Sequence, residues 1–287
     1  MAAMKIVRTI PAMQALADRW RRRGLVVGLV PTMGALHAGH LSLVRAARRA
    51  CDRVVVSIFV NPLQFGPAED YGRYPRAPGR DRRALARAGV DAVFSPSVGA
   101  MYPTGHATGV EVTGPLVARL CAPRRPGHFR GVATVVTMLF HAVRPHVAWF
   151  GRKDAQQAAV LRRLTRDLGF GIRIVVAPTV REPGGLAMSS RNAGLSAGDR
   201  RRAPVLFRAL RAGREAVGRG VRRRAGVLAA MRRVLAAEPR VRVQYLDIVD
   251  ADTLEPIPRL RGRVLLAVAA HLGRTRLIDN LVCRVSR

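Results

Sequence analysis

Two histidines three residues apart follow a short apolar run near the N-terminus. His37 and His40 lie in the segment 31–40, together with Gly34 and Gly39. Glycines permit tight turns and close backbone approach, and the start of a helix offers free N–H groups and the positive end of the helix dipole. The segment therefore predicts a binding site for a phosphate chain. A helix cap with two incidental histidines is the alternative, and a zinc site is disfavoured because no third ligand is near.

Lysine occurs at only two positions, Lys5 and Lys153, in a chain with 50 lysines and arginines. Lys153 lies in the segment GRKDAQQ (151–157), directly after a predicted strand. A lysine suits a phosphate oxygen as a mobile point charge. Asp154 suits either a ribose hydroxyl or the cap of the following helix, and Gln157 lies one helical turn beyond Lys153. We therefore expect a second phosphate-binding segment here.

Neutral amides and hydroxyls form the remaining polar segments. Asn61 and Gln64 follow another predicted strand and could bind hydroxyls or a carboxylate, although a simple turn is the better interpretation of that segment alone. The segment 188–191 carries two serines and an arginine beside a glycine-rich connector, which is typical of a mobile loop that closes on phosphates; a polar linker is the alternative. The chain lacks a P-loop, a GxGxxG fingerprint and a GxSxG elbow. This inventory favours a reaction that depends on positioning and charge stabilisation.

Short apolar runs alternate with helical patterns in the first part of the chain, and these elements must position the polar segments. The patterns predict strands at 25–30, 54–60, 91–94, 146–150 and 172–176, and helices at 39–50, 80–87, 131–143 and 155–168. This alternation predicts an α/β fold with a parallel sheet, whose ligands bind beyond the carboxyl ends of the strands.

The character of the sequence changes near residue 181. An Arg/Ala-rich helical stretch at 198–237 is followed by strands predicted at 241–249, 263–270 and 275–280. These elements predict a smaller α+β domain. We therefore expect one domain at 1–181 and a second at 182–287.

The composition narrows the class of protein. The net charge is +32, but the arginines are dispersed, whereas a nucleic-acid-binding protein clusters its charge. We therefore expect no specific nucleic-acid partner. The three cysteines form no CxxC pair, which disfavours a zinc site or a disulfide framework. No apolar run approaches the roughly 18 residues that span a bilayer. We expect a cytoplasmic protein with no membrane partner.

The segments together are far more specific than any one of them. HxGH with a later Ser/Arg loop resembles the nucleotidyltransferase α/β superfamily. The chain further resembles the pantothenate synthetase (pantoate–β-alanine ligase) family in motifs that keep the family's order and cover essentially the whole chain: PTMGALHAGH (31–40), SIFVNPLQFG (57–66), YPR (74–76), MYP (101–103), RPGHFRGVATVV (125–136), GRKDAQQ (151–157), GLAMSSRN (185–192) and LGRTRLIDN (272–280).

The resemblance implies a cytoplasmic homodimer. It implies a Rossmann-like N-terminal domain that binds ATP and pantoate and a small α+β C-terminal lid domain. The implied enzyme condenses (R)-pantoate with β-alanine, using ATP and Mg²⁺, through a pantoyl adenylate, and yields pantothenate, AMP and pyrophosphate. Another adenylate-forming nucleotidyltransferase of the superfamily is the first alternative, and a non-enzymatic nucleic-acid-binding protein is the second.

The resemblance also implies roles for individual residues. Four would be catalytic, with His40 as the proton donor: His37, His40, Lys153 and Arg191. ATP would contact Met33, Gly34, Ala35, Leu36, His37, Ala38, Gly39, His40, Gly151, Arg152, Lys153, Asp154, Val180, Met188, Ser189, Ser190 and Arg191. The substrates pantoate and β-alanine would contact Asn61, Gln64, His128, Arg130 and Gln157. Asp81 would be a metal ligand.

The chain departs from the family pattern at several positions. Arg152 stands where an acid is common, and Ala155 stands where an aromatic residue is usual. Gly184 and Gly194 replace a usual Asp and Tyr, and Arg80 breaks an acidic pair next to Asp81. None of these changes removes a residue that the resemblance assigns to ATP or pantoate contact, so an active enzyme is expected.

Overall fold

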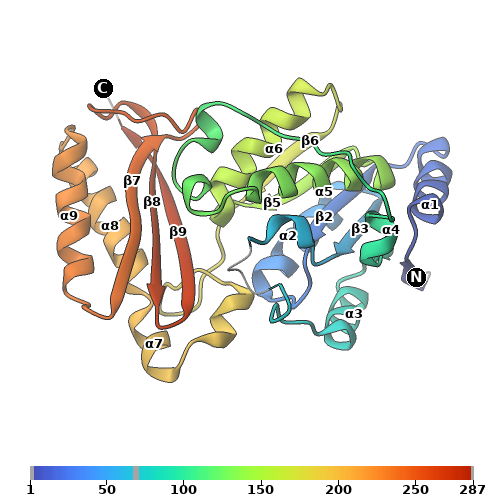
Figure 1. Ribbon diagram of the computed structural model, residues 1–287, viewed down its shortest axis with the longest axis horizontal. Coiled ribbons are helices and arrows are strands. Elements are labelled where there is room, and N and C mark those ends of the chain that lie inside the picture. The colour runs from blue at the N-terminus through green and yellow to red at the C-terminus, as the bar shows by residue number, and fades with distance from the viewer. Residues whose placement is uncertain (1–2, 67–70, 286–287) are drawn as a thin grey trace. The chain divides into compact units, whose positions relative to one another are not determined.

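The computed structural model describes residues 3–66 and 71–285. The chain forms two compact units (Figure 1). The first comprises Met1–Thr113, Arg124–Gly151 and Val160–Ala177, and the second comprises Gly114–Pro123, Arg152–Ala159 and Pro178–Arg287. The boundary that the sequence predicts between residues 181 and 182 stays a prediction.

A parallel sheet forms the centre of the first unit. Within the described residues it has six strands, in the order β1-β4-β3-β2-β5-β6. Gly28 of the central strand β2 pairs with Val54 of β3 on one side and with Val147 of β5 on the other, so the carboxyl ends of these three strands lie at one edge of the sheet. The strands are β1 (Lys5–Val7), β2 (Val27–Thr32), β3 (Arg53–Ile58), β4 (Ala92–Phe94), β5 (Val147–Gly151) and β6 (Arg173–Ala177).

Each face of this sheet has its own apolar core because successive strand residues point to opposite faces. Leu29 and Val55 pack with helices α1 (Ile10–Arg22) and α5 (His128–Val143). Their neighbours Val30 and Val56 pack with α2 (Ala38–Ala50) and α3 (Pro78–Arg87) in a separate cluster. Continuous apolar strands such as 53–58 are therefore buried on both faces. A short helix, α4 (Val98–Met101), and a 3₁₀ turn, η1 (Pro62–Gln64), complete the connections of this unit.

The second unit contains an antiparallel sheet with helices against one face. Among the described residues its strands are β7 (Val241–Asp250), β8 (Gly262–Leu272) and β9 (Thr275–Val285), in that order. Alternate residues of β8, from Val264 to Leu272, pack with α8 (Val205–Gly218) and α9 (Arg224–Ala236) (Figure 1). Its other elements are α7 (Ala197–Arg202) and the 3₁₀ turns η2 (Pro115–Val117), η3 (Ala122–Arg124), η4 (Arg152–Asp154) and η5 (Ser190–Gly194). Helix α6 (Ala155–Asp167) begins in this unit and ends in the first.

The structure confirms the predicted fold class, a parallel α/β sheet with a smaller α+β unit. The predicted strands and helices are all present, with ends that shift by a few residues. The structure adds β1, α1 and α4, which the sequence interpretation left out. No helix within the described part of the chain is long and apolar enough to cross a membrane.

Candidate active site

The loop after β2 has a tightly specified backbone. Gly34 and Ala35 both have positive φ, at 83° and 50°. This conformation costs an alanine about 1–2 kcal/mol. The Asp81 carboxylate offsets that cost by accepting the N–H groups of Ala35 and Leu36 at 2.8 and 2.9 Å, and the side chain is 1% exposed. Asp81, in the first turn of α3, therefore fixes the shape of the segment that the sequence predicts for phosphate binding.

The two histidines of this segment cap helix α2. The Nδ1 of His37 accepts the N–H of Gly39 at 3.1 Å, and the Nδ1 of His40 accepts the N–H of His37 at 3.4 Å. Their ring centroids lie 4.0 Å apart. Because each Nδ1 acts as an acceptor, a neutral ring carries its proton on Nε2. The capping interpretation is thus correct, and phosphate binding by the two histidines stays a prediction.

The two predicted amides meet Met33 of the same loop. The Asn61 Nδ2 donates to Gln64 Oε1 at 3.1 Å and to the Gly131 carbonyl at 3.0 Å, and the Gln64 Nε2 donates to the Met33 Sδ at 3.2 Å. Asn61 is 1% exposed and Gln64 is 9% exposed. The structure therefore brings Asn61, Gln64 and Met33 together beyond the carboxyl ends of β2 and β3, in a polar cluster whose members carry no charge.

Three more side chains support this cluster. His128 contacts the Gln64 carbonyl through Nδ1 at 2.8 Å, and Arg125 contacts His128 Nε2 at 2.9 Å. The Tyr102 hydroxyl donates to Asn61 Oδ1 at 2.7 Å. Burial raises the pKa of Tyr102, so its proton stays in place for this bond. Sequence reasoning predicted His128 but not Arg125 or Tyr102, although both lie in the quoted motifs RPGHFRG and MYP.

Helix α5 approaches the amide turn closely at Gly131. A Cβ at this position would lie 2.2 Å from the Leu63 carbonyl oxygen, so only glycine fits without a backbone shift. The neighbouring Arg130, which the resemblance implies for substrate contact, is exposed and lies beside Gly109. The contacts described above do not include Arg130, and its role stays a prediction.

The Lys153 segment lies in the second unit and begins as the turn η4. Lys153 and Gln157 are half-buried, whereas Arg152 and Asp154 are exposed. The side chain of Gln156, which sequence reasoning did not single out, is buried and fully bonded. It accepts the Cys121 N–H at 2.9 Å and donates to the carbonyls of Leu116 and Arg119, both at 2.8 Å. Gln156 thereby fixes the start of α6, which carries Gln157.

The Ser/Arg loop follows a short hairpin in the same unit. The Met188 N–H donates to the Val180 carbonyl at 3.0 Å, which brings together two residues that the resemblance assigns to ATP. The Ser189 Oγ accepts the Arg191 N–H at 3.3 Å at the start of η5. Glu182 binds Asn192 Nδ2 at 2.8 Å, which joins the hairpin to the far side of the loop.

A protein-held magnesium site does not fit the described residues, which contain no group of three His, Cys, Asp or Glu side chains that could hold a metal ion. The two oxygens of Asp81 already accept backbone N–H groups. Mg²⁺ in phosphoryl-transfer sites commonly binds through substrate phosphates and water, with only one or two carboxylates. Asp81 as a metal ligand stays a prediction.

Comparison with known proteins identifies close relatives along the whole chain. A family model described as Pantoate-beta-alanine ligase matches residues 5–282. The chain is 54% identical over 283 residues to a pantothenate synthetase of Moorella thermoacetica, covering 99% of this chain and 100% of that protein. It is 51% identical over 282 residues to a pantothenate synthetase of Heliobacterium modesticaldum, covering 98% and 100%.

Solved structures give the same result. A pantothenate synthetase from Thermus thermophilus matches with a TM-score of 0.93 and 52% identity, over 97% of this chain and 99% of that chain. A pantoate-beta-alanine ligase from Francisella tularensis, complexed with beta-gamma ATP and β-alanine, matches with a TM-score of 0.80 and 33% identity, over 98% of both chains.

Proposed function

We infer that this chain, which belongs to the pantoate-beta-alanine ligase family, condenses (R)-pantoate with β-alanine and consumes ATP in doing so. In the first step, a carboxylate oxygen of pantoate attacks the α-phosphorus of ATP, and pyrophosphate leaves. In the second, the β-alanine amine attacks the acyl carbon of the adenylate, loses a proton and displaces AMP. The products are pantothenate, AMP and pyrophosphate.

One observation carries this proposal, the buried pair of amides Asn61 and Gln64 beside Met33. Neutral amides can orient the hydroxyls and carboxylate of pantoate without raising the affinity of that carboxylate for protons. The carboxylate therefore stays a nucleophile. We assign Gln64 to pantoate and then to β-alanine, with Asn61 near the reacting groups. Gln157, His128 and Arg130 complete the proposed substrate contacts.

The first step brings a carboxylate towards a polyanionic triphosphate, so positive charge and N–H donors must offset the repulsion. We assign this task to Lys153, Arg191 and the Nε2–H groups of the two histidines, with His40 as the proton donor. Contacts that strengthen in the transition state lower the barrier, whereas equally strong ground-state contacts do not. Removing one such donor typically costs about 3–4 kcal/mol, or about 10²–10³ in rate.

The remaining ATP contacts are assigned from the same family pattern. Asp81 sets the shape of the loop that the proposal assigns to the phosphates. The Francisella ligase with beta-gamma ATP and β-alanine bound supports both substrates for this chain. The other residues in this proposal are Met33, Gly34, Ala35, Leu36, Ala38, Gly39, Gly151, Arg152, Asp154, Val180, Met188, Ser189 and Ser190.

Three further parts of the proposal rest on the family resemblance. Mg²⁺ accompanies ATP, and when bound it neutralises phosphate charge. The enzyme is a homodimer, and it works in the cytoplasm.

The test is to measure pyrophosphate and AMP with ATP and Mg²⁺ while adding (R)-pantoate and β-alanine separately and together. The proposal expects pantoate-dependent ATP–pyrophosphate exchange without β-alanine, and AMP with pantothenate only when both substrates are present. Exchange with a different carboxylic acid but not with pantoate would favour another adenylate-forming enzyme of the superfamily. If neither pyrophosphate nor AMP forms with pantoate and β-alanine, the proposal is contradicted.

A further inference from the structure

Two consecutive buried polar residues lie on strand β9. Asp279 and Asn280 belong to the motif LGRTRLIDN, and each is 4% exposed. Neighbouring residues of a strand point to opposite faces of the sheet. Buried acids and amides are rare without a partner because their transfer from water is unfavourable. These two side chains therefore need specific partners on the two faces of the sheet.

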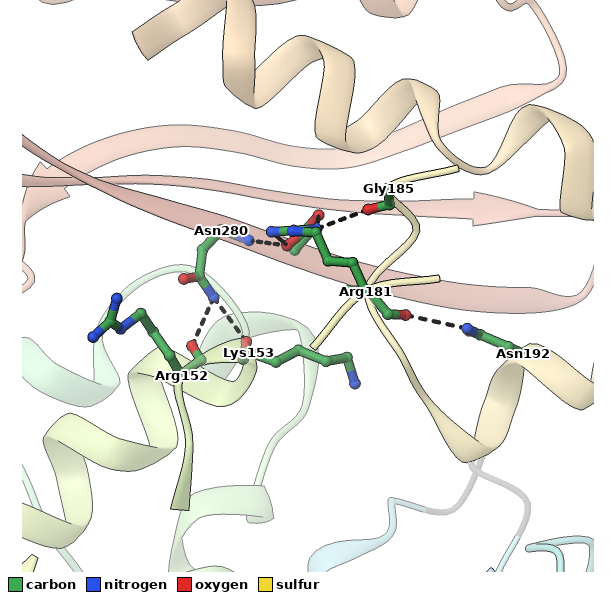
Figure 2. A network of polar contacts seen from close by, with 8 residues as sticks. Arg152, Lys153, Arg181, Gly185, Asn192 and Asn280 are labelled. Carbon is green, nitrogen blue, oxygen red and sulfur yellow. Dashed lines mark hydrogen bonds and ion pairs between the residues drawn. The ribbon is translucent and has the colours of Figure 1, made fainter. Parts of the chain in front are cut away.

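Asn280 finds its partners in the turn that carries Lys153. Its Nδ2 donates to the Arg152 carbonyl at 3.0 Å and to the Lys153 carbonyl at 2.8 Å (Figure 2). The Lys153 side chain extends away from Asn280 (Figure 2). The asparagine thus holds the backbone from which the lysine side chain projects.

Asp279 finds its partner in the hairpin that leads to the Ser/Arg loop. Arg181 donates to both carboxylate oxygens, at 2.6 and 3.0 Å, and also donates to the Gly185 carbonyl at 3.0 Å (Figure 2). Its guanidinium carbon lies 3.8 Å from the centre of the Phe207 ring, which adds a cation–π contact. Asp279 therefore orients the Arg181 side chain, and this side chain bonds to Gly185 within the 180–188 hairpin.

We propose that Asp279 and Asn280 are positioning residues for the nucleotide, Asn280 through Lys153 and Asp279 through Arg181 and the 180–188 hairpin. The inference rests on the proposed function. A role in stability does not by itself require polar side chains here, because replacing a buried ion pair by well-packed apolar residues is often neutral or stabilising. The polar bonds of this pair lead to two segments that the proposed function assigns to ATP.

The test for Asn280 is a double-mutant cycle with Lys153. Asn280→Ala should lower pantoate-dependent ATP–pyrophosphate exchange by about ten- to a hundredfold, as expected when a catalytic group is misplaced by about 1 Å. In a Lys153→Ala background the same change should lower exchange by less than about twofold, because there is no ammonium group left to misplace. Equal factors in both backgrounds would overturn the proposal. Where exchange by Lys153→Ala is below detection, the same cycle is measured as the Kd for ATP by calorimetry.

Further variants separate positioning from folding. Asn280→Asp keeps the shape of the side chain but turns an acceptor towards two carbonyls, so it should lose as much exchange as Asn280→Ala. Arg284→Ala, an exposed change on the same strand, should leave exchange unchanged. Thermal unfolding checks that each variant folds, and Asn280→Ser replaces Asn280→Ala if the alanine variant does not fold. If no substitution at Asn280 folds, the residue is a folding requirement and the proposal is wrong.

Amide hydrogen exchange tests the two parts of the proposal, Asn280 with the Lys153 turn and Asp279 with the 180–188 hairpin, without relying on activity. Asp279→Asn should speed amide exchange in peptides that cover 180–188 and leave 152–154 unchanged, whereas Asn280→Ala should do the reverse. Acceleration of both segments by either change would overturn the separate assignments. A wild-type enzyme without pantoate-dependent activity would instead contradict the proposed function, and the hydrogen-exchange result would still decide whether each residue holds its segment.

Discussion

The Nδ1 of His40 accepts the backbone N–H of His37, and the Nδ1 of His37 in turn accepts the N–H of Gly39, so both rings are bound to the start of α2. A good helix cap needs only an acceptor at this position. The proposed chemistry needs a donor as well. Substitution can separate the two requirements, because a side chain such as asparagine supplies the acceptor of the helix cap but lacks the Nε2–H donor.

We predict that His37→Asn keeps the fold and loses the activity. Asparagine is a strong N-cap residue, so the free energy of unfolding should stay within about 0.5 kcal/mol of the wild type. The lost Nε2–H should lower ATP–pyrophosphate exchange by about 10²–10³. His37→Ala removes the cap as well and should cost about 1 kcal/mol of stability. Urea denaturation and exchange assays check both values, and a fully active His37→Asn enzyme would limit His37 to capping.

Asp81→Ala should weaken the loop rather than a metal site. The change leaves the N–H groups of Ala35 and Leu36 buried without their acceptor, which costs about 1–3 kcal/mol per group. Exchange activity should fall, and excess Mg²⁺ should not restore it. Asp167→Ala, which breaks an exposed ion pair with Arg163, is the control and should change stability by less than about 1 kcal/mol. Recovery of Asp81→Ala at high Mg²⁺ would instead support the metal ligand that the sequence predicts.

Gly131→Ala should displace the turn that holds the two amides. The added methyl group would meet the Leu63 carbonyl and the Gln64 N–H, at 2.2 and 2.6 Å. Overpacking of this kind typically costs about 1–3 kcal/mol, and more where backbone must move. We expect lower stability and a higher KM for pantoate. Gly99→Ala in α4 meets nothing within 4 Å and serves as the matched control. Unchanged pantoate kinetics in Gly131→Ala would argue against the assignment of this turn to pantoate.

Three of the polar segments could be located from sequence because they follow the strands β2, β3 and β5. The Ser/Arg loop at 188–191 instead follows the short hairpin. Apolar runs such as 54–60 and the turn signals after them locate strand ends, and parallel strands end at one edge. The helix α1 also left a signal, with Pro11 in its first turn and buried residues at Met13, Leu16 and Trp20, but the sequence interpretation did not use it. The three-residue strand β1 is too short for a periodic signal.

Partners distant in sequence could not be predicted. Asp81 binds Ala35 across 46 positions, and Asn280 binds Lys153 across 127. A single sequence shows that a buried acid or amide needs a partner but not which backbone group supplies it. The motif around Asn280 therefore received no role, and the metal-ligand role that the resemblance implies for Asp81 stays a prediction. The reciprocal capping by His37 and His40 was likewise predicted only as an alternative.

The free energy of unfolding should decrease as the pH falls, and the titration of His146 is one cause. Burial, and to a smaller extent Arg21, lowers the pKa of His146, whose Nδ1 accepts the Val27 N–H at 2.9 Å. The unfolded chain therefore binds the proton first, so the stabilisation is complete above the unfolded pKa of about 6.5 and is lost as pH falls through the folded pKa. Burial and Arg276 lower the pKa of His271 in the same direction.

The measurement is urea denaturation from about pH 7 to about pH 5. The free energy of unfolding of the wild type should fall across this range. His146→Gln should be less stable at pH 7, because burial of the ring is lost, but should show a shallower fall with pH. An identical slope in the two proteins would mean that His146 does not contribute to the pH dependence.

The hydrogen bonds from Asn280 are accepted by the backbone carbonyl oxygens of Arg152 and Lys153, so they do not depend on the side chains of these two residues. A substitution that reverses the charge of Arg152 should therefore leave the backbone support of Lys153 intact. For protein engineers, position 152 is therefore a place where the charge beside Lys153 can be changed while Lys153 keeps its backbone support.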